Sequence, residues 1–265
     1  MPERSVREDA MVRGLDIFRD YFRDYQDHYV LIGGAACDVL MADAGLEFRA
    51  TKDLDIVLCV EVLNAEFGQH FWRFIEEGGY RQREMGSGDK EYYRFVEPAE
   101  QTFPIMIELF SRRPDEIELF GEAHLTPVPV DEDISSLSAI LLDDDYYQCL
   151  LEGKQVIDGI CLLKPEYILA FKVRAYLDMK SQPAGTTWAT DGKIRKHRAD
   201  IFRLFGLLSS DLTVVAPEAV KEDLRDFIAV MQSDKTLEIR DLGIRSRTLD
   251  EVLGSLRNIF QLENG

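Results

Sequence analysis

Short apolar runs alternate with longer amphipathic segments along the first part of the chain. Buried strands are predicted over YVLIG (29–33), LDIVLCV (54–60) and FPIMIELF (103–110). Helical spacing is found at Leu15, Phe18, Phe22 and Tyr25, over AACDVLMADAG (35–45) and over EVLNAEFGQHFWRFIEEGG (61–79). YRQREM and EYYRFV flank MGSGDK, which has the composition of a hairpin turn. This order predicts a mixed sheet with helices against it, in an α/β (α+β) unit.

The pattern changes in the second half of the chain. AILL (139–142), YYQCLLEG (146–153) and KQVIDGICLL (154–163) are consistent with short strands or a hairpin extension. Pro165 then stands at a plausible first helical position. Helices are predicted over PEYILAFKVRAYLDM, DGKIRKHRADIFRLFGLL, PEAVKEDLRDFIAVM and RTLDEVLGSLRNIFQL. We therefore expect two domains, an α/β domain over residues 1–160 and a C-terminal helical domain over residues 161–265.

Composition limits the classes of function. No apolar run approaches the length of about 18 residues that a transmembrane helix needs, and the charged N-terminus does not resemble a secretion signal, so we expect a cytoplasmic protein without a membrane partner. The four cysteines are far apart, have no metal-ligand spacing and are expected to be buried thiols. The formal charge of −18 argues against binding nucleic acid without sequence preference.

The charge is unevenly distributed. Residues 164–203 contain nine Lys or Arg and four acids, a net charge of +5, which leaves −23 for the rest of the chain. Such a local excess suggests an anionic ligand, and the alternative is a solvated helix face with no ligand.

Two aspartates, Asp53 and Asp55, lie at the start of the apolar strand predicted over LDIVLCV (54–60). Alternate residues of a strand point to the same side, so Asp53 and Asp55 share one face while Leu54 and Ile56 point to the other. If Glu108 lies on a neighbouring strand and on that face, three carboxylates converge. Such a cluster requires a cation, and Mg²⁺, or Mn²⁺, prefers oxygen ligands. The alternatives are solvent-facing aspartates and a Glu108 that is an edge-strand acid or pairs with Arg112.

Gly33 and Gly34 follow the first strand directly. A strand that turns into a helix through glycine presents backbone N–H groups and the positive end of the helix dipole, which suits the triphosphate of an NTP. A tight turn without a ligand is the alternative. Arg49 and Thr51 precede the second strand and either orient phosphate or shape the turn.

These segments, VLIGGAACDVL, RATKDLDIVL and IMIELF, resemble the signature of the polymerase-beta-like nucleotidyltransferase superfamily, whose members transfer a nucleoside monophosphate from an NTP. The resemblance implies that Gly33 and Gly34 contact the triphosphate, that Asp53 and Asp55 hold the metals, and that Glu108 is the third acid, which also helps to deprotonate the acceptor. Many members of the superfamily have aspartate at that third position.

The second half is similar to the helical segment of the type IV toxin (abortive-infection) nucleotidyltransferases. Their pattern has a lysine in the first helix, here Lys172, and a later cluster matched by Lys196, Asp200 and Ile201, with His197 where the pattern has an acid. The two lysines are either phosphate ligands or ordinary surface lysines, Lys196 then pairing with Asp200.

The resemblance implies transfer to an RNA end, such as tRNA, or to a protein hydroxyl, with an antitoxin as a further partner. The overall acidity suits a small cationic acceptor instead, as in the aminoglycoside nucleotidyltransferases. A nucleotide-binding module without turnover is the third possibility.

Overall fold

The structure is a computed structural model of the chain. It describes residues 12–49, 51–59, 64–82, 92–111, 140–141, 143–183, 186, 190–234, 237–242 and 244–262. The chain divides into two compact units, one within Met1–Val130 together with Lys154–Leu163, the other within Asp131–Gly153 together with Lys164–Gly265. Each unit has its own hydrophobic core.

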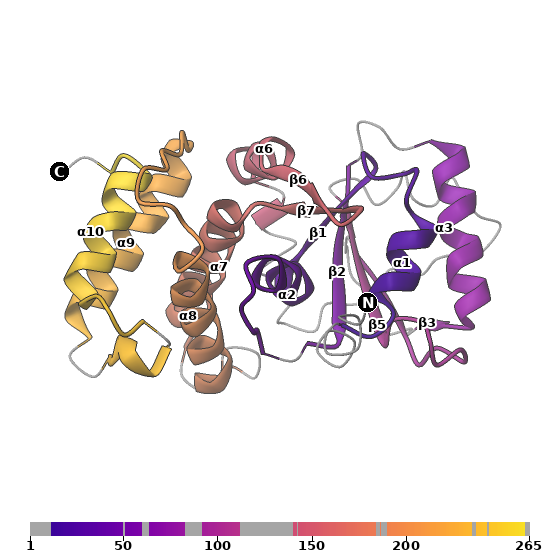
Figure 1. Cartoon of the computed structure of the whole chain (residues 1–265), viewed down its shortest axis with the longest axis horizontal. Helices are drawn as coiled ribbons and strands as arrows, with labels where there is room; N and C mark the ends of the chain where they lie inside the picture. The colour runs from indigo at the N-terminus through magenta and orange to yellow at the C-terminus, as the bar shows by residue number, and fades with distance from the viewer. Residues whose placement is uncertain are drawn as a thin grey trace, which may run out of the picture. The chain divides into compact units, whose positions relative to one another are not determined.

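The first unit contains a mixed sheet (Figure 1). Its strands are β1 (Tyr29–Ile32), β2 (Asp53–Leu58), β3 (Arg81–Gln82), β4 (Tyr92–Val96), β5 (Met106–Ser111), β6 (Lys154–Ile157) and β7 (Ile160–Leu163). In the described part of the chain they form one seven-stranded sheet in the order β3-β4-β5-β2-β1-β7-β6. The pairs β2–β5 and β1–β7 are parallel, and the other pairs are antiparallel. The predicted mixed sheet is therefore confirmed.

Helices cover both faces of this sheet. Helix α2 (Gly33–Asp43) lies on one side, and α1 (Leu15–Tyr21) and α3 (Ala65–Gly78) lie on the other (Figure 1). An aromatic cluster fills the space under α1 and α3, where Phe18, Phe22 and Phe74 are almost fully buried. The ring centroids of Phe18 and Phe22 are 4.6 Å apart, and those of Phe22 and Phe74 are 5.2 Å apart. Burial of these rings holds both helices against the sheet.

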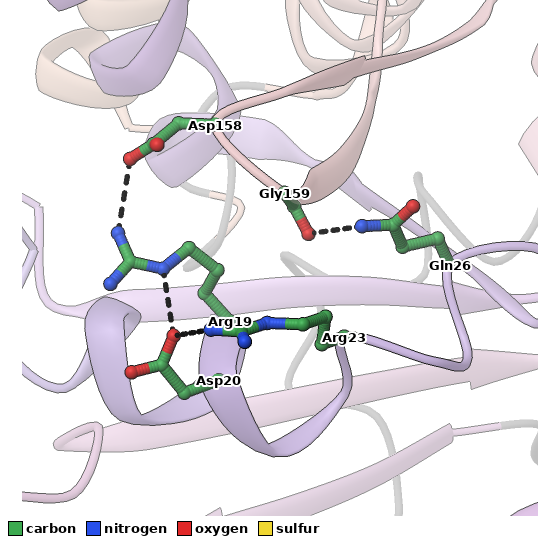
Figure 2. Close-up of polar contacts among 6 residues, drawn as sticks. All are labelled: Arg19, Asp20, Arg23, Gln26, Asp158 and Gly159. Atoms are coloured by element: carbon green, nitrogen blue, oxygen red, sulfur yellow. Dashed lines mark hydrogen bonds and ion pairs between the residues drawn. The ribbon is translucent and has the colours of Figure 1, made fainter.

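The hairpin β6–β7 turns at Asp158 and Gly159. Both residues have positive φ, 47° and 81°, as the tightest hairpin turns require, and Asp-Gly is a preferred pair there. Figure 2 shows how this turn is joined to the N-terminal part of the same unit. Arg19 binds the carboxylates of Asp20 and Asp158, and Gln26 Nε2 donates to the carbonyl oxygen of Gly159 at 2.7 Å. These bonds attach the β6–β7 turn to α1 through Arg19 and to the segment before β1 through Gln26.

The second unit is helical (Figure 1). Its helices are α6 (Asp144–Glu152), α7 (Pro165–Ser181), α8 (Asp191–Phe205), α9 (Glu218–Ser233), the short 3₁₀ helix η2 (Ile239–Leu242) and α10 (Leu249–Ile259). Helix α7 packs on α6, α8 and α9, and α10 packs on α9. Helix α10 begins with a capping box between Thr248 and Glu251, which satisfies backbone N–H groups at that end. The predicted C-terminal helical part is confirmed.

Two expectations need correction. Residues 146–153 were predicted as a strand or hairpin extension, but they belong largely to helix α6, because the Asp143 carboxylate accepts bonds from the N–H groups of Asp145 and Tyr146 and begins a helix there. The division into 1–160 and 161–265 places a boundary inside the hairpin β6–β7. Contacts instead assign the whole hairpin to the first unit and α6 to the second.

The cysteines behave as expected. Cys37, Cys59, Cys149 and Cys161 are free and buried. Burial raises the pKa of the Cys149 and Cys161 thiols to about 12, which keeps them protonated and unreactive. Each helix that the structure describes is too short or too polar to span a bilayer.

Candidate functional site

The site predicted from the sequence lies in the first unit, where β1 ends and α2 begins. Strand β2 has the burial pattern expected for it: Leu54 and Ile56 are buried in the core, and Asp53 and Asp55 are partly exposed. The two aspartates therefore share the face opposite to the core residues of the strand.

Strand register brings Glu108 next to Asp55. β2 and β5 are parallel, with Asp55 opposite Glu108 and Asp53 opposite Met106. Register partners on neighbouring strands point their side chains to the same side, at a strand spacing of about 4.8 Å. The structure thus places Glu108 on the face of the two aspartates, as predicted, with Asp55 as its direct neighbour.

The partner of Glu108 is an arginine that the sequence motifs did not indicate. Arg94 on β4 is opposite Glu108 in the antiparallel pair β4–β5. Its Nε and Nη2 atoms lie 2.8 Å and 2.7 Å from Glu108 Oε1. The alternative partner considered above, Arg112, is outside the described residues. Arg94 in EYYRFV precedes Glu108 by one predicted strand, which was a possible signal of an ion pair. The sequence could not show this pair, because it depends on which strands are neighbours in the sheet.

The carboxylate of Asp55 lies against the glycine turn. Gly34 N–H donates to Asp55 Oδ2 at 3.4 Å, a long bond. Ile32 at the N-cap of α2 offers no side-chain acceptor, so Asp55 supplies an acceptor and a negative charge to the start of this helix. The N–H group predicted to contact triphosphate is thus directed to Asp55 in this conformation.

Both glycines are required by close contacts. Gly33 has φ of +68°, and a Cβ atom there would overlap with the Asp55 carboxylate. A Cβ atom at Gly34 would lie 2.7 Å from Thr51 Oγ1 and 3.6 Å from Arg49 Nη2. The structure therefore brings Arg49 and Thr51 to the glycine turn. The guanidinium carbon of Arg49 also lies 5.1 Å from the ring centroid of Phe48.

The residues present suit Mg²⁺ or Mn²⁺ in type. All three acids offer oxygen donors on one face, which is the donor set that these ions prefer. Among the described residues, however, no three His, Cys, Asp or Glu side chains are gathered as a formed metal site. Glu108 is bonded to Arg94, and Asp55 is bonded to Gly34. Metal binding by Asp53, Asp55 and Glu108 stays a prediction.

Lys172 and Lys196 belong to the second unit. Lys172 on α7 is buried, and its Nζ atom lies 3.0 Å from Asp200 Oδ2 on α8. Asp200 also binds Arg203 at 3.2 Å, and its side chain is 1% exposed. Lys172 therefore joins two packed helices, and its predicted role as a phosphate ligand stays untested. Lys196 is exposed on α8.

Other basic residues of the window 164–203 also form internal bonds. Arg174 binds Asp178 and Asp223, and Arg198 lies 2.8 Å from Asp234. The pair Arg174–Asp178 lies within α7, whereas Asp223 belongs to α9 and Asp234 caps its C-terminal end, so the other bonds join α7 and α8 to α9. This favours the interpretation of the basic window as part of the helical framework.

Comparison with known proteins gives similarity in structure only. No protein-family model matches the sequence, and no curated protein matches it. Among solved structures, an antigenic nucleotidyltransferase-like protein from Paracoccidioides brasiliensis is 14% identical, with a TM-score of 0.47, over 94% of this chain and 99% of that chain. The polyadenylate synthase of Megavirus is 15% identical, with a TM-score of 0.41, over 83% of this chain and 36% of that one.

A third similar structure is the antibiotic-resistance factor ANT(2'')-Ia, which is 13% identical, with a TM-score of 0.38, over 83% of this chain and 94% of that chain. At these TM-scores the similarities do not assign a reaction to this chain.

Proposed function

We propose that the chain is a divalent-metal-dependent nucleotidyltransferase, which transfers a nucleoside monophosphate from an NTP to an acceptor hydroxyl and releases pyrophosphate. The observation that carries the proposal is the position of Asp55 next to Glu108 on parallel strands, with Asp53 on the same face and the Gly33–Gly34 turn beside them. The resemblance of these segments to the polymerase-beta-like superfamily supports the same assignment.

The roles of the side chains follow from their chemistry. Asp53, Asp55 and Glu108 would hold Mg²⁺ or Mn²⁺, which when bound lowers the charge of the triphosphate and favours the leaving pyrophosphate. Gly34 N–H and the start of α2 would contact phosphate oxygens in place of the long bond to Asp55. Arg49 and Thr51, next to Gly34, would orient the triphosphate. Glu108 would accept the proton of the acceptor hydroxyl.

For the acceptor, we propose an RNA end, such as tRNA, or a protein hydroxyl, as in the type IV toxin enzymes that the second half resembles. An antitoxin partner would belong to the same proposal, as would a cytoplasmic location. Arg195 and Lys196 on α8 are exposed basic residues, and we propose that they contact RNA phosphates.

A small cationic acceptor is the second candidate, and a specific observation favours it. Lys172, Arg174, Arg198 and Arg203 are in ion pairs within the helical unit, so less of the basic window serves an external anion. The rest of the chain has a formal charge of −23, since the total is −18 and the window contributes +5. Such a charge attracts a polycationic acceptor of the aminoglycoside type.

One labelling experiment tests both candidates. The full chain is incubated with α-labelled NTPs and Mg²⁺ or Mn²⁺, together with total RNA, a protein extract or a set of aminoglycosides. Label on one pool identifies the acceptor class. Asp53→Asn and Asp55→Asn should abolish the transfer, whereas Asp158→Asn, at an exposed aspartate of the same unit, should retain it.

The opposite result would favour a nucleotide-binding module without turnover. In that case no pool is labelled, and NTP binds equally well to the wild type and to the Asp53→Asn and Asp55→Asn variants.

A further inference from the structure

Arg94 forms two short charge-assisted contacts with Glu108, one of the predicted site residues. Two of its guanidinium nitrogens lie 2.8 Å and 2.7 Å from Glu108 Oε1. The side chains of Arg94 and Glu108 are 11% and 9% exposed. Charge-assisted bonds of this length, largely shielded from water, fix the position of both groups.

The pair stands at the end of a row across the sheet. Ile32 on β1, Asp55 on β2, Glu108 on β5 and Arg94 on β4 are successive register partners. The row therefore places two carboxylates on neighbouring strands, with a cation on the strand next to Glu108. At its other end, the N–H group of Gly34 faces Asp55. The repulsion between the two acids is thus compensated by groups of the protein itself.

Both bonds from Arg94 end on the same oxygen of Glu108. The bonds of Glu108 to described residues involve Oε1, which leaves Oε2 as the oxygen for a metal ion or an acceptor proton. A guanidinium group that holds one oxygen restricts the rotation of the carboxylate. It also reduces the affinity of that carboxylate for a second cation, because the two cations repel each other.

We propose that Arg94 is a positioning residue of the acidic site, which orients Glu108 through Oε1 and competes with the divalent cation for this carboxylate. The inference rests on the metal-binding part of the proposed function. Arg94 then has two opposed effects: it raises the metal concentration needed for half-occupancy, and it holds Glu108 in the orientation that the transfer needs.

The test measures Mn²⁺ binding to the full chain without nucleotide, by the loss of the free-ion signal in electron paramagnetic resonance. Arg94→Gln keeps a donor but removes the charge, and it should bind Mn²⁺ about tenfold more tightly than the wild type. Arg94→Lys keeps the charge, and its Mn²⁺ affinity should stay within about twofold of the wild-type value. Since a lysine cannot form the two-nitrogen contact, this variant should lose kcat with little change in KM for NTP.

A matched control is available on the next strand. Arg81 on β3 binds Glu97, which directly follows β4, at 3.1 Å, and the two side chains are 79% and 69% exposed. Arg81→Gln removes an arginine–glutamate pair of the same sheet that includes none of the three acids and is exposed to water, so it should leave Mn²⁺ affinity unchanged. Thermal unfolding of each variant is recorded with and without Mn²⁺. Without Mn²⁺, Arg94→Gln should unfold at a lower temperature than the wild type. Addition of Mn²⁺ should raise the unfolding temperature of Arg94→Gln by more than that of the wild type.

The outcomes separate this inference from the proposed function. A folded Arg94→Gln that binds Mn²⁺ no more tightly than the wild type overturns the role of Arg94, even if the wild type transfers nucleotides. Tighter Mn²⁺ binding by Arg94→Gln that is lost when Asp55→Asn is added to the same chain supports the role of Arg94. This holds even if no acceptor is labelled and the proposed transfer fails. A wild type that binds no Mn²⁺ overturns both.

Discussion

Gly33 and Asp55 are in direct contact: the Asp55 carboxylate occupies the space that a side chain at Gly33 would fill. Gly33 also has a left-handed backbone, with φ of +68°. The glycine at the end of β1 is therefore required by the acid on β2, which links the two halves of the sequence motif physically.

We predict that Gly33→Ala abolishes Mn²⁺ binding and nucleotide transfer, because the new methyl group displaces Asp55. Gly45→Ala is the matched control, since Gly45 has a similar φ of +72° and nothing within 4 Å of an added Cβ. Both substitutions should cost about 1–2 kcal/mol of unfolding free energy, measured by urea denaturation, from the left-handed backbone alone. Gly45→Ala should retain Mn²⁺ binding. Equal Mn²⁺ affinity of the two variants would contradict the claim that the contact between Gly33 and Asp55 is needed for Mn²⁺ binding.

The ion pair between Lys172 and Asp200 gives a second prediction. Lys172→Met should lower the unfolding free energy by about 3 kcal/mol, because it leaves the buried Asp200 carboxylate with fewer partners. Asp200→Asn should cost a similar amount, and the double variant should cost clearly less than the sum. The exposed Lys196→Met should change stability by less than about 0.5 kcal/mol.

The measurement is a double-mutant cycle in urea, together with NTP titrations. An unchanged stability of Lys172→Met, with a higher KM for NTP, would instead identify Lys172 as a phosphate ligand.

The hydroxyl of Tyr146 provides a third prediction. It donates to Asp223 Oδ2 at 2.6 Å, and burial raises the pKa of this tyrosine. Tyr146→Phe should cost about 1–2 kcal/mol, because Asp223 loses a buried donor. Tyr25→Phe is the control, since its 3.1 Å bond to Glu66 is exposed, and it should cost less than about 0.5 kcal/mol. Calorimetric unfolding of both variants gives the comparison, and equal losses would show that the bond to Asp223 is not strong.

Asp38 on α2 gives a prediction about pH. Burial raises the pKa of its carboxyl group above the ordinary value of 3.8, while a bond from the backbone of Val12 opposes this effect. The folded state therefore holds the proton more strongly than the unfolded state. Asp38 favours folding most at low pH, and this contribution is lost as pH rises from about 3.8 through the raised pKa.

Asp38→Asn should accordingly be more stable than the wild type near neutral pH, and the difference should shrink as the pH falls below about 4. Urea denaturation across this pH range checks the sign. A difference that grows toward acid would mean that the carboxylate, not the acid, is the form favoured by folding.

Much of the fold was predictable because its signals are local. The alternation in DLDIVL fixed which face the aspartates share, and Pro165 marked the start of a long helix. Helix α6 was missed because its tyrosines favour strands, whereas the local signal, the capping carboxylate of Asp143, is a single side chain.

The site was predictable only in part, because some of its contacts are between residues far apart in the sequence. The face shared by Asp53 and Asp55 follows from their spacing. The contact of Glu108 with Arg94 depends on which strands are neighbours, and that order is set by packing of the whole sheet. Likewise, the partner of Lys172 is 28 residues away on another helix, and spacing within one helix could not reveal it.

The path of the chain through its two units has a consequence for biosynthesis. Strands β6 and β7 complete the edge of the sheet, yet they are encoded after α6, which belongs to the other unit. A nascent chain on the ribosome cannot close this sheet until Leu163 has left the exit tunnel. A cut before α6 would leave the first unit without β6 and β7, and a cut after β7 would leave the second unit without α6. Separate expression of the units would therefore require a rearranged gene, in which the hairpin is moved next to the segment that it pairs with.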